Sequence, residues 1–280
     1  MTESVAQPRW DLPAAIALAC IVQTIISLLA ACTPVLATEI AADRGWNVAL
    51  IALYAPVLCI ARIALTFAVP GLLVLLGGMG LNLACVGISV VGLLCLLPPS
   101  LVIVALAPVA MGFATAAMNP ASSQILGPRT TPRTAGFIMS LKQTGVPLGG
   151  VVAGAAVPIL VLRSGWQDAV LYIAAACSVV TLALLPTVRW LNGDRTETRK
   201  SESGPLEPLK RLLAIPGMPS FLVAAAIFTA MQLCLRSFLT VYLVELGFGL
   251  ATAGMMFSVS QGAGMVGQVA WGVVSDRLLT

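Results

Sequence analysis

The sequence predicts an all-α fold, a polytopic bundle of helices embedded in a membrane, and its composition supplies the main reasons. Hydrophobic residues make up 59% of the 280 residues, whereas charged residues make up 9%. A water-soluble domain carries about a quarter charged residues, so this chain has too few charges to cover a solvated surface. Apolar runs of roughly 20 residues, the length that crosses a bilayer core, recur along the chain.

Eight apolar runs are long enough to be transmembrane helices. Most are separated by short polar or proline-rich turns. Between the second and third runs, however, residues 68–78 are apolar, with only proline and glycine to interrupt the pattern. The predicted spans are 12–36, 46–67, 79–97, 101–126, 135–161, 168–190, 218–243 and 251–272.

One polar segment, 191–217, separates a six-helix N-terminal bundle (1–190) from the first two helices of a second bundle (218–280). Its charges and prolines are typical of a solvated linker. With the N-terminus inside, ten of the 15 Lys and Arg residues lie in inner loops or flanks, two in outer loops and three within spans. Basic residues are retained on the cytoplasmic side. We therefore expect a bacterial-type inner (plasma) membrane protein with both termini and the linker in the cytoplasm.

The residues present exclude several chemistries. The sequence has no histidine, which removes His-based catalytic triads and histidine metal ligands. Its seven cysteines are scattered singly without a C-x-x-C pair, so we interpret them as small apolar residues and expect no metal site. No G-x-x-x-x-G-K-[ST] phosphate-binding motif occurs. We expect neither an enzyme nor an ATP-driven pump, with no cofactor and no nucleic-acid partner. The lipid bilayer is the expected surroundings.

Two cations lie deep inside predicted spans. Lys142 is about 10 Å into the fifth span at ~1.5 Å per residue, and Arg236 lies at a similar depth in the seventh. A cation at such depth costs at least ~2.5 kcal/mol unless it is compensated, yet no Asp or Glu occupies the middle of any span. Their partner is expected to be an anionic substrate or an acid in further helices. Arg62, near the inner end of the second span, is interpreted as snorkelling to the interface.

Polar side chains within spans are expected to face the bundle interior. Gln23, Asn119 and Gln232 lie mid-span in the first, fourth and seventh spans, and Gln143 follows Lys142. They are candidate substrate-binding residues, with interhelical hydrogen bonding, worth about 0.6 kcal/mol on average, as the alternative role. The glycines of the fifth span form small-x-x-x-small rows that favour close helix packing. These are Gly145, Gly149, Gly150 and Gly154.

The end of the eighth span carries the motif Gly272-x-x-x-Asp276-Arg277. It resembles the loop signature that follows the second helix of each six-helix half in the major facilitator superfamily. We interpret Gly272 as permitting a tight helix exit and Arg277 as an anchor at the cytoplasmic face. The counterpart in the first half is expected near 68–78, where the sequence has neither an acid nor a base.

Segments of the fifth and seventh spans resemble one branch of this superfamily. Segments 140–150 and 232–239 are similar to the cyanate/nitroimidazole-type branch of that superfamily, which includes transporters of small organic or inorganic anions. The resemblance implies a secondary transporter in which spans one, four and seven line a central cavity. Members normally have twelve spans, so a chain that ends soon after its eighth span is expected to be a fragment.

The sequence therefore predicts a monomeric secondary transporter of a small organic or inorganic anion, working by alternating access. A gradient of substrate or of a coupling ion would supply the energy. Two alternatives stay open. One is efflux of lipophilic or drug-like compounds, which the cationic Lys142 disfavours. The other is a non-transporting truncated remnant, which the apolar 68–78 segment favours.

Overall fold

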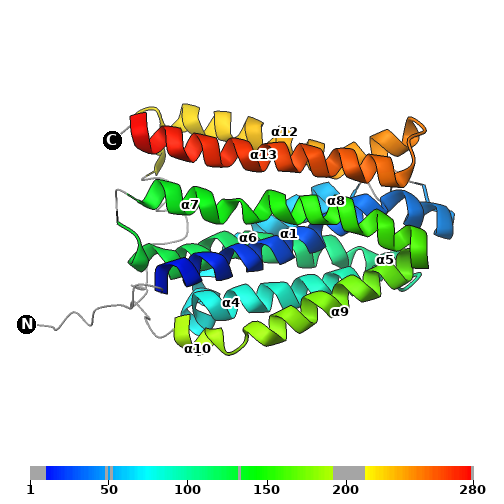
Figure 1. The fold of residues 1–280 in the computed structure, drawn as a ribbon, viewed down its shortest axis with the longest axis horizontal. Helices are drawn as coiled ribbons and strands as arrows, with labels where there is room; N and C mark the ends of the chain where they lie inside the picture. Colours follow the sequence, from blue (N-terminus) through cyan, green and yellow to red (C-terminus); the bar gives the residue numbers. More distant parts are fainter. Residues whose placement is uncertain (1–10, 48–49, 51–52, 132–133, 192–211, 279–280) are drawn as a thin grey trace, which may run out of the picture.

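A computed structural model describes residues 11–47, 50, 53–131, 134–191 and 212–278 of the chain. Its regular elements are all helices, with no strand among the described residues, so the predicted all-α fold is confirmed. The long helices lie side by side in a bundle (Figure 1). They are α1 (Asp11–Arg44), α3 (Tyr54–Thr66), α4 (Val69–Leu94), α5 (Leu101–Val104), α6 (Leu106–Leu126), η1 (Gly127–Arg129), α7 (Ala135–Gln143), α8 (Gly145–Ser164), α9 (Trp166–Leu184), α10 (Thr187–Leu191), α12 (Met218–Glu245) and α13 (Leu250–Leu278).

Six helical segments of the described residues are long and apolar enough to cross a membrane. They are α1, α4, the segment from α5 to η1, the segment from α7 to α8, α9, and α12. The helix α3 is apolar but has only 13 residues. The helix α13 has 29 residues, and its many glycines and two glutamines make it less apolar than the others.

The predicted ends of the first three spans differ from the ends of the helices in the structure. The helix α1 continues past residue 36 to Arg44 because none of its last residues breaks a helix, and the chain turns at Gly45 with φ of 63°. The sequence left the exact turn between the second and third spans open within residues 68–78. The structure has the turn at residues 67–68, and the helix α4 begins at Val69. The helix is interrupted at Gly77, whose φ of 69° and ψ of 171° suit only glycine. The loop expected near 68–78 is therefore mostly helical.

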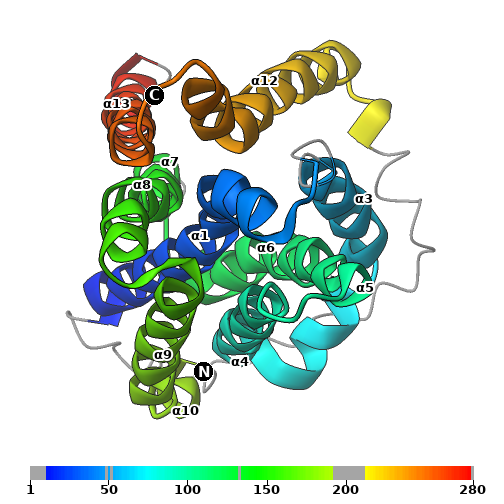
Figure 2. The same cartoon turned by 90° about the vertical axis from the view of Figure 1, so that its right-hand side faces the viewer.

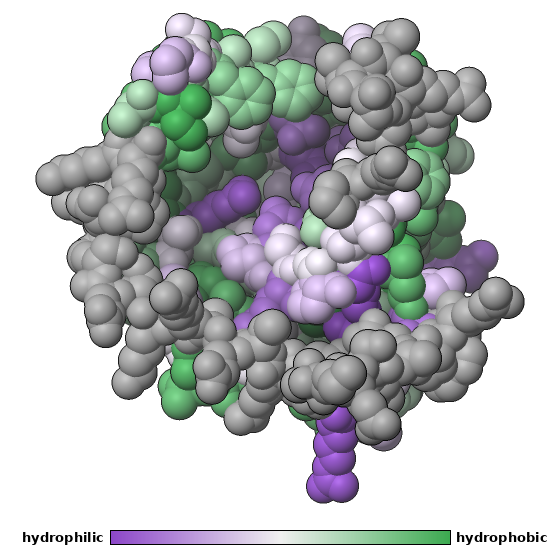
Figure 3. All heavy atoms as spheres, turned by 90° about the vertical axis from the view of Figure 1, so that its left-hand side faces the viewer, coloured by the Kyte–Doolittle hydropathy of each residue, from purple (hydrophilic) through white to green (hydrophobic). Residues whose placement is uncertain are grey.

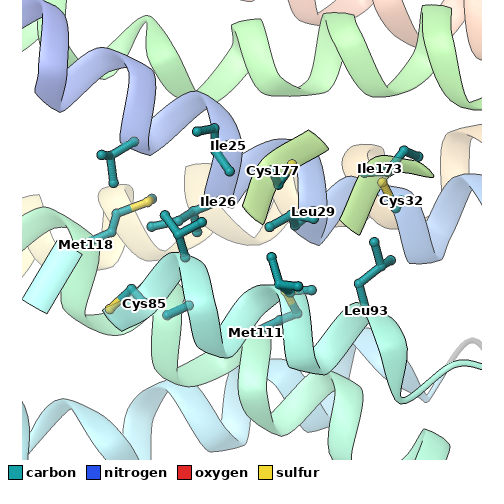
Figure 4. Close-up of a cluster of buried hydrophobic side chains, with 14 of the residues drawn as sticks. Ile25, Ile26, Leu29, Cys32, Cys85, Leu93, Met111, Met118, Ile173 and Cys177 are labelled. Carbon is teal, nitrogen blue, oxygen red and sulfur yellow. The ribbon is translucent and has the colours of Figure 1, made fainter. Parts of the chain in front are cut away.

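The core lies between α1, α4, α6 and α9 (Figure 4). Ile26 and Leu29 of α1 are fully buried there. Three of the cysteines, Cys32, Cys85 and Cys177, are buried in the same cluster, and all seven are free thiols. Because lipid tails are as apolar as the core, tight packing rather than exclusion from water holds these helices together.

The helices α12 and α13 lie along one side of this bundle (Figure 2). The helix α13 packs against α7 and α8, while α12 packs against α1 and α13. Among the residues of α12 only Thr240 is buried. Most of the predicted 191–217 linker, namely 192–211, lies outside the described residues.

Candidate functional site

Three residues predicted to bind substrate converge on one point inside the bundle. Lys142 of α7 is 3% exposed, and its Nζ donates a hydrogen bond of 3.3 Å to Oδ1 of Asn119 in α6. The same oxygen accepts a hydrogen bond of 3.0 Å from Nε2 of Gln23 in α1. The amide of Asn119 thus holds both side chains, and the ammonium of Lys142 is met by a neutral oxygen rather than by a carboxylate.

A break in the fifth predicted span places Lys142. The helix α7 ends at Gln143 and α8 starts at Gly145. Pro147 has no backbone N–H and so cannot donate to the carbonyl of Gln143. At the joint Thr144 turns its backbone N–H to the carbonyl of Leu141 at 3.2 Å. Lys142 therefore lies in the last turn of a short helix, beside a joint where the ordinary helical hydrogen bonding is interrupted.

Arg236 is held by neutral groups from two other helices. Its Nε donates to Oε1 of Gln261 in α13 at 2.9 Å, and its Nη2 donates to the carbonyl oxygen of Val146 in α8 at 3.0 Å. The guanidinium of α12 therefore joins α8 to α13. Because each partner is a neutral amide oxygen, its positive charge is not cancelled at this point.

A cavity of about 770 Å³ has Lys142 in its wall and is lined by residues of α6, α7, α12 and α13. We call it the Lys142 cavity. Its lining includes Gly136, near the start of α7, and Trp271, near the end of α13. It therefore lies toward the face at which α1 begins and α13 ends. Figure 3 shows that face, with a hollow in which hydrophilic side chains are visible.

A second cavity, of about 270 Å³, contains Arg236 and is lined by α1, α3, α6, α8, α12 and α13 together with Gln143 at the end of α7. We call it the Arg236 cavity. Three amide residues, Asn119, Gln143 and Gln232, line both cavities. The four predicted polar positions Gln23, Asn119, Gln143 and Gln232 are therefore gathered at the boundary between the two cavities or hydrogen bonded to it.

Arg62 of α3 also lines the Arg236 cavity, a position that the sequence interpretation missed. Its side chain is exposed, and it makes no hydrogen bond or ion pair with any residue that the structure describes. The distance from the span end suggested snorkelling to the interface, but depth does not tell which face of a helix a residue occupies. Tyr54 and Leu58 line the same cavity at steps of four residues before Arg62, and this spacing was the available signal.

The charges in the two cavities are all of one sign. Among their lining residues, only Lys142, Arg62 and Arg236 are charged, and the described lining contains no Asp or Glu. Uncompensated cations at such positions are costly in a low-dielectric interior. The arrangement therefore favours an anionic ligand.

Two other cations of the bundle, Arg129 and Arg44, have partners within the protein. Arg129 forms an ion pair of 2.9 Å with Asp11, and both side chains are at most 7% exposed. Arg44 donates to the carbonyl of Leu97 at 2.9 Å and lies about 5 Å from the ring centres of two tryptophans, an arrangement that stabilises a guanidinium. Among the described residues, none of the three cavity cations has an ion pair of the kind that joins Arg129 to Asp11.

The glycines of α8 pack against two different helices. A Cβ at Gly149 would clash with the backbone of α1, and one at Gly145 would lie 2.7 Å from the carbonyl oxygen of Cys20 in the same helix. On the other side, Gly150 and Gly154 face α13, where a Cβ at either would clash with Gln261 or with the backbone of Gly254. These glycines permit the close approach of three helices at the level of the cavities.

The Gly272 motif differs in structure from its sequence interpretation. The helix α13 continues through residue 272 to Leu278, so Gly272 is not a helix exit. A Cβ there would lie 2.8 Å from Cβ of Ser140 in α7, which makes the residue a close-packing position at the mouth of the Lys142 cavity. The side chains of Asp276 and Arg277 lie outside the described residues.

A third cavity, of about 210 Å³, has an almost entirely apolar lining from α1, α3, α5, α6, the segment that precedes α3 and the end of α4. Tyr54 lines both this apolar cavity and the Arg236 cavity, and its hydroxyl donates to the carbonyl of Ala30 at 3.4 Å. No group of three metal-ligating side chains occurs in the described part of the chain.

Comparison with known proteins identifies the family. The family model of the Major Facilitator Superfamily matches residues 19–280. The chain belongs to the Major Facilitator Superfamily. With its apolar helices, this membership makes it a multi-pass membrane protein of a transporter family.

Two curated superfamily proteins are similar to part of the chain. They are uncharacterized MFS-type transporters of Mycobacterium tuberculosis, MT3072 of strain CDC 1551 / Oshkosh and Rv2994 of strain ATCC 25618 / H37Rv. Each is 27% identical to this chain over 174 residues. The aligned segment covers 60% of this chain and 37% of each relative, so the chain matches little more than a third of their length.

Proposed function

We propose that this superfamily member is a secondary transporter that moves a small organic or inorganic anion by alternating access. The observation that carries the proposal is the environment of Lys142, which is 3% exposed and whose ammonium donates to the neutral oxygen Asn119 Oδ1. A bound anion would supply the charge that the described lining lacks. The resemblance of segments 140–150 and 232–239 to the cyanate/nitroimidazole-type branch supports the same substrate class.

The arrangement of the two cavities supports alternating access. They share the amides Asn119, Gln143 and Gln232, so a solute bound near Lys142 has a second compartment directly beyond it. The contact between α8 and α13 includes the facing glycines Gly154 and Gly254, and we propose that the two helices shift against each other there during alternating access. We propose that the six N-terminal spans and the α12–α13 pair belong to the opposing groups and that the transporter works as a monomer.

The test of the anion site is a pair of substitutions at Lys142. Lys142→Met removes the charge while suiting lipid and helix packing, so uptake of a substrate anion by the reconstituted full-length gene product should fall by at least about a hundredfold. Lys142→Arg keeps the charge but replaces a point donor with a planar fork, so partial uptake with altered selectivity is expected. Anion uptake by Lys142→Met equal to wild type, at equal membrane abundance, contradicts the proposal.

A matched control comes from the same pair of helices. Arg163 is exposed near the end of α8 and lines neither the Lys142 cavity nor the Arg236 cavity. Arg163→Met removes a positive charge of the same sign from the surface, so it should leave anion uptake unchanged. A loss in both variants would assign the effect to total charge rather than to the cavity.

Efflux of lipophilic compounds is the second candidate, and the apolar cavity favours it. That cavity of about 210 Å³ is smaller than the roughly 300–1,000 Å³ of sites for drug-sized ligands, and Tyr54 separates it from the Arg236 cavity. Under this alternative, Lys142→Met would leave transport of an uncharged lipophile intact. It would also leave unchanged the effect of an anion added as a competitor. The same two variants therefore distinguish the two functions.

The orientation in the membrane is part of the proposal. The asymmetry of ten inner against two outer basic residues places both termini and the 191–217 linker in the cytoplasm of a bacterial-type cell. Reporter fusions after Gly204 and after Thr280 should both score as cytoplasmic. A periplasmic score at either site would reverse or break the eight-span topology.

A further inference from the structure

The three cavity cations occupy two separate places. Lys142 lies in the Lys142 cavity, whereas Arg62 and Arg236 both line the Arg236 cavity. The two arginines come from α3 and α12, helices far apart in the sequence. Each cavity thus offers positive charge, and the lining that the structure describes offers no negative charge to either.

The two places lie next to each other. Arg236 donates to the carbonyl of Val146, and Val146 follows Lys142 by four residues, across the joint between α7 and α8. The shared amides Asn119, Gln143 and Gln232 lie at the boundary between them. A short molecule can therefore reach both places at once.

A substrate with a single negative charge would leave the site unbalanced. With one carboxylate on Lys142, Arg62 and Arg236 would still share a cavity of about 270 Å³ without a counter-charge, and like charges that line one small cavity repel each other. A second carboxylate would compensate this pair. Arginine suits that role because its planar fork of donors matches the two oxygens of a carboxylate.

We propose that the substrate is a short dicarboxylate, with one carboxylate on Lys142 and the other between Arg62 and Arg236. This inference rests on the proposed anion transport and adds the number and spacing of the charges. Arg236 is held in place by Gln261 and Val146, so it presents a fixed donor. Arg62 has no such contact among the described residues and closes on the second carboxylate when it arrives.

The test compares carboxylates that differ in charge and length. Titration calorimetry on the purified full-length gene product, at about pH 7.5 where both carboxylates are ionised, would use butyrate, malonate, succinate and adipate at constant ionic strength. Succinate should bind at least about tenfold more tightly than butyrate. Malonate and adipate hold their two carboxylates closer together and farther apart than succinate, so the dicarboxylate that binds most tightly reports the separation of the two cation places.

Substitutions assign the second carboxylate. Arg62→Gln should reduce succinate affinity to the level of butyrate and leave butyrate affinity unchanged, whereas Lys142→Met should weaken both ligands. Arg163→Gln, at the exposed end of α8, serves as the control of equal charge change and should alter neither. A succinate preference that persists in Arg62→Gln would overturn the assignment of the second carboxylate to Arg62 and Arg236.

The outcomes for the two proposals are distinct. If none of the four carboxylates binds to wild type, the dicarboxylate inference is wrong, and the anion site is judged by the uptake of other anions in wild type and Lys142→Met. If butyrate and succinate bind equally and Lys142→Met weakens both, the anion site stands and the dicarboxylate inference is wrong. Tighter binding of succinate that is lost in both Lys142→Met and Arg62→Gln supports the two proposals together.

Discussion

The Lys142 cavity and the Arg236 cavity adjoin each other, yet they hold their cations in different ways. Lys142 is nearly inaccessible and is held by one amide oxygen at 3.3 Å. Arg236 is tied to two helices by hydrogen bonds of 2.9 and 3.0 Å. It shares its cavity with Arg62, which is exposed and makes no ion pair with any residue that the structure describes. The Lys142 cavity thus has a buried charge with one hydrogen bond. The Arg236 cavity has one arginine fixed by two hydrogen bonds and a second arginine without such contacts among the described residues.

The difference separates two roles that composition alone does not distinguish. A single weak acceptor leaves two of the three ammonium donors of Lys142 available to a ligand, which suits binding and release. The guanidinium of Arg236 already donates hydrogen bonds to α8 and α13, so this residue both faces the cavity and holds helices together. Substitution of Arg236 should therefore affect stability as well as ligand affinity, whereas substitution of Lys142, which removes one hydrogen bond to Asn119, should affect mainly affinity.

The largest effect expected from testing this difference is that of Asn119→Asp. The new carboxylate would take the place of the amide oxygen that lies 3.3 Å from Lys142 Nζ and would form an ion pair with it. Because the ammonium would then be compensated within the protein, affinity for succinate should fall by about a hundredfold, or ~2.7 kcal/mol. Titration calorimetry on the purified variant measures the change.

Asn119→Ala is the matched control for this effect. It removes the acceptor shared by Lys142 and Gln23 but adds no charge, so its affinity for succinate should lie between those of wild type and Asn119→Asp. Wild-type succinate affinity in Asn119→Asp would show that Lys142 does not contact the ligand, and the two cavities would no longer differ in role.

A smaller effect is expected for Arg236→Lys. The lysine keeps the charge in the cavity but cannot reproduce a fork that reaches Gln261 and Val146 together. Succinate affinity should fall by about tenfold, and the loss of an interhelical hydrogen bond should lower stability by about 0.6 kcal/mol. Thermal unfolding followed by tryptophan fluorescence, alongside calorimetry, separates the two changes. Lower affinity without any loss of stability would remove the structural role assigned to Arg236.

Much of the fold could be predicted because the membrane imposes strong rules. Runs of apolar residues identified every long helix, and the absence of mid-span acids identified Lys142 and Arg236 as unusual. Helix ends were predicted less well, since α1 runs on to Arg44 and residues 68–78 are helical up to Gly77. In lipid a helix keeps its own hydrogen bonds until a residue such as glycine interrupts it, so polarity marks the membrane boundary rather than the helix end.

The candidate site was predicted in part for a related reason. Gln23, Asn119 and Lys142 were expected to face the interior, and the hydrogen bonds that join them follow from how α1, α6 and α7 pack. Arg62 was missed because its distance from a span end gives its depth but not its face. Gly272 was misread as a helix exit, since its contact with Ser140 depends on packing between α7 and α13 that no local pattern encodes.

The facing glycines of α8 and α13 also constrain how this sequence can change over time. Gly154 and Gly254 lie so close that a methyl group added to either would meet the backbone carbonyl of the other. Neither position can accept even alanine while the two helices keep their present separation, and replacing one glycine gains no room for the other. A substitution at either glycine therefore requires that α8 and α13 move apart.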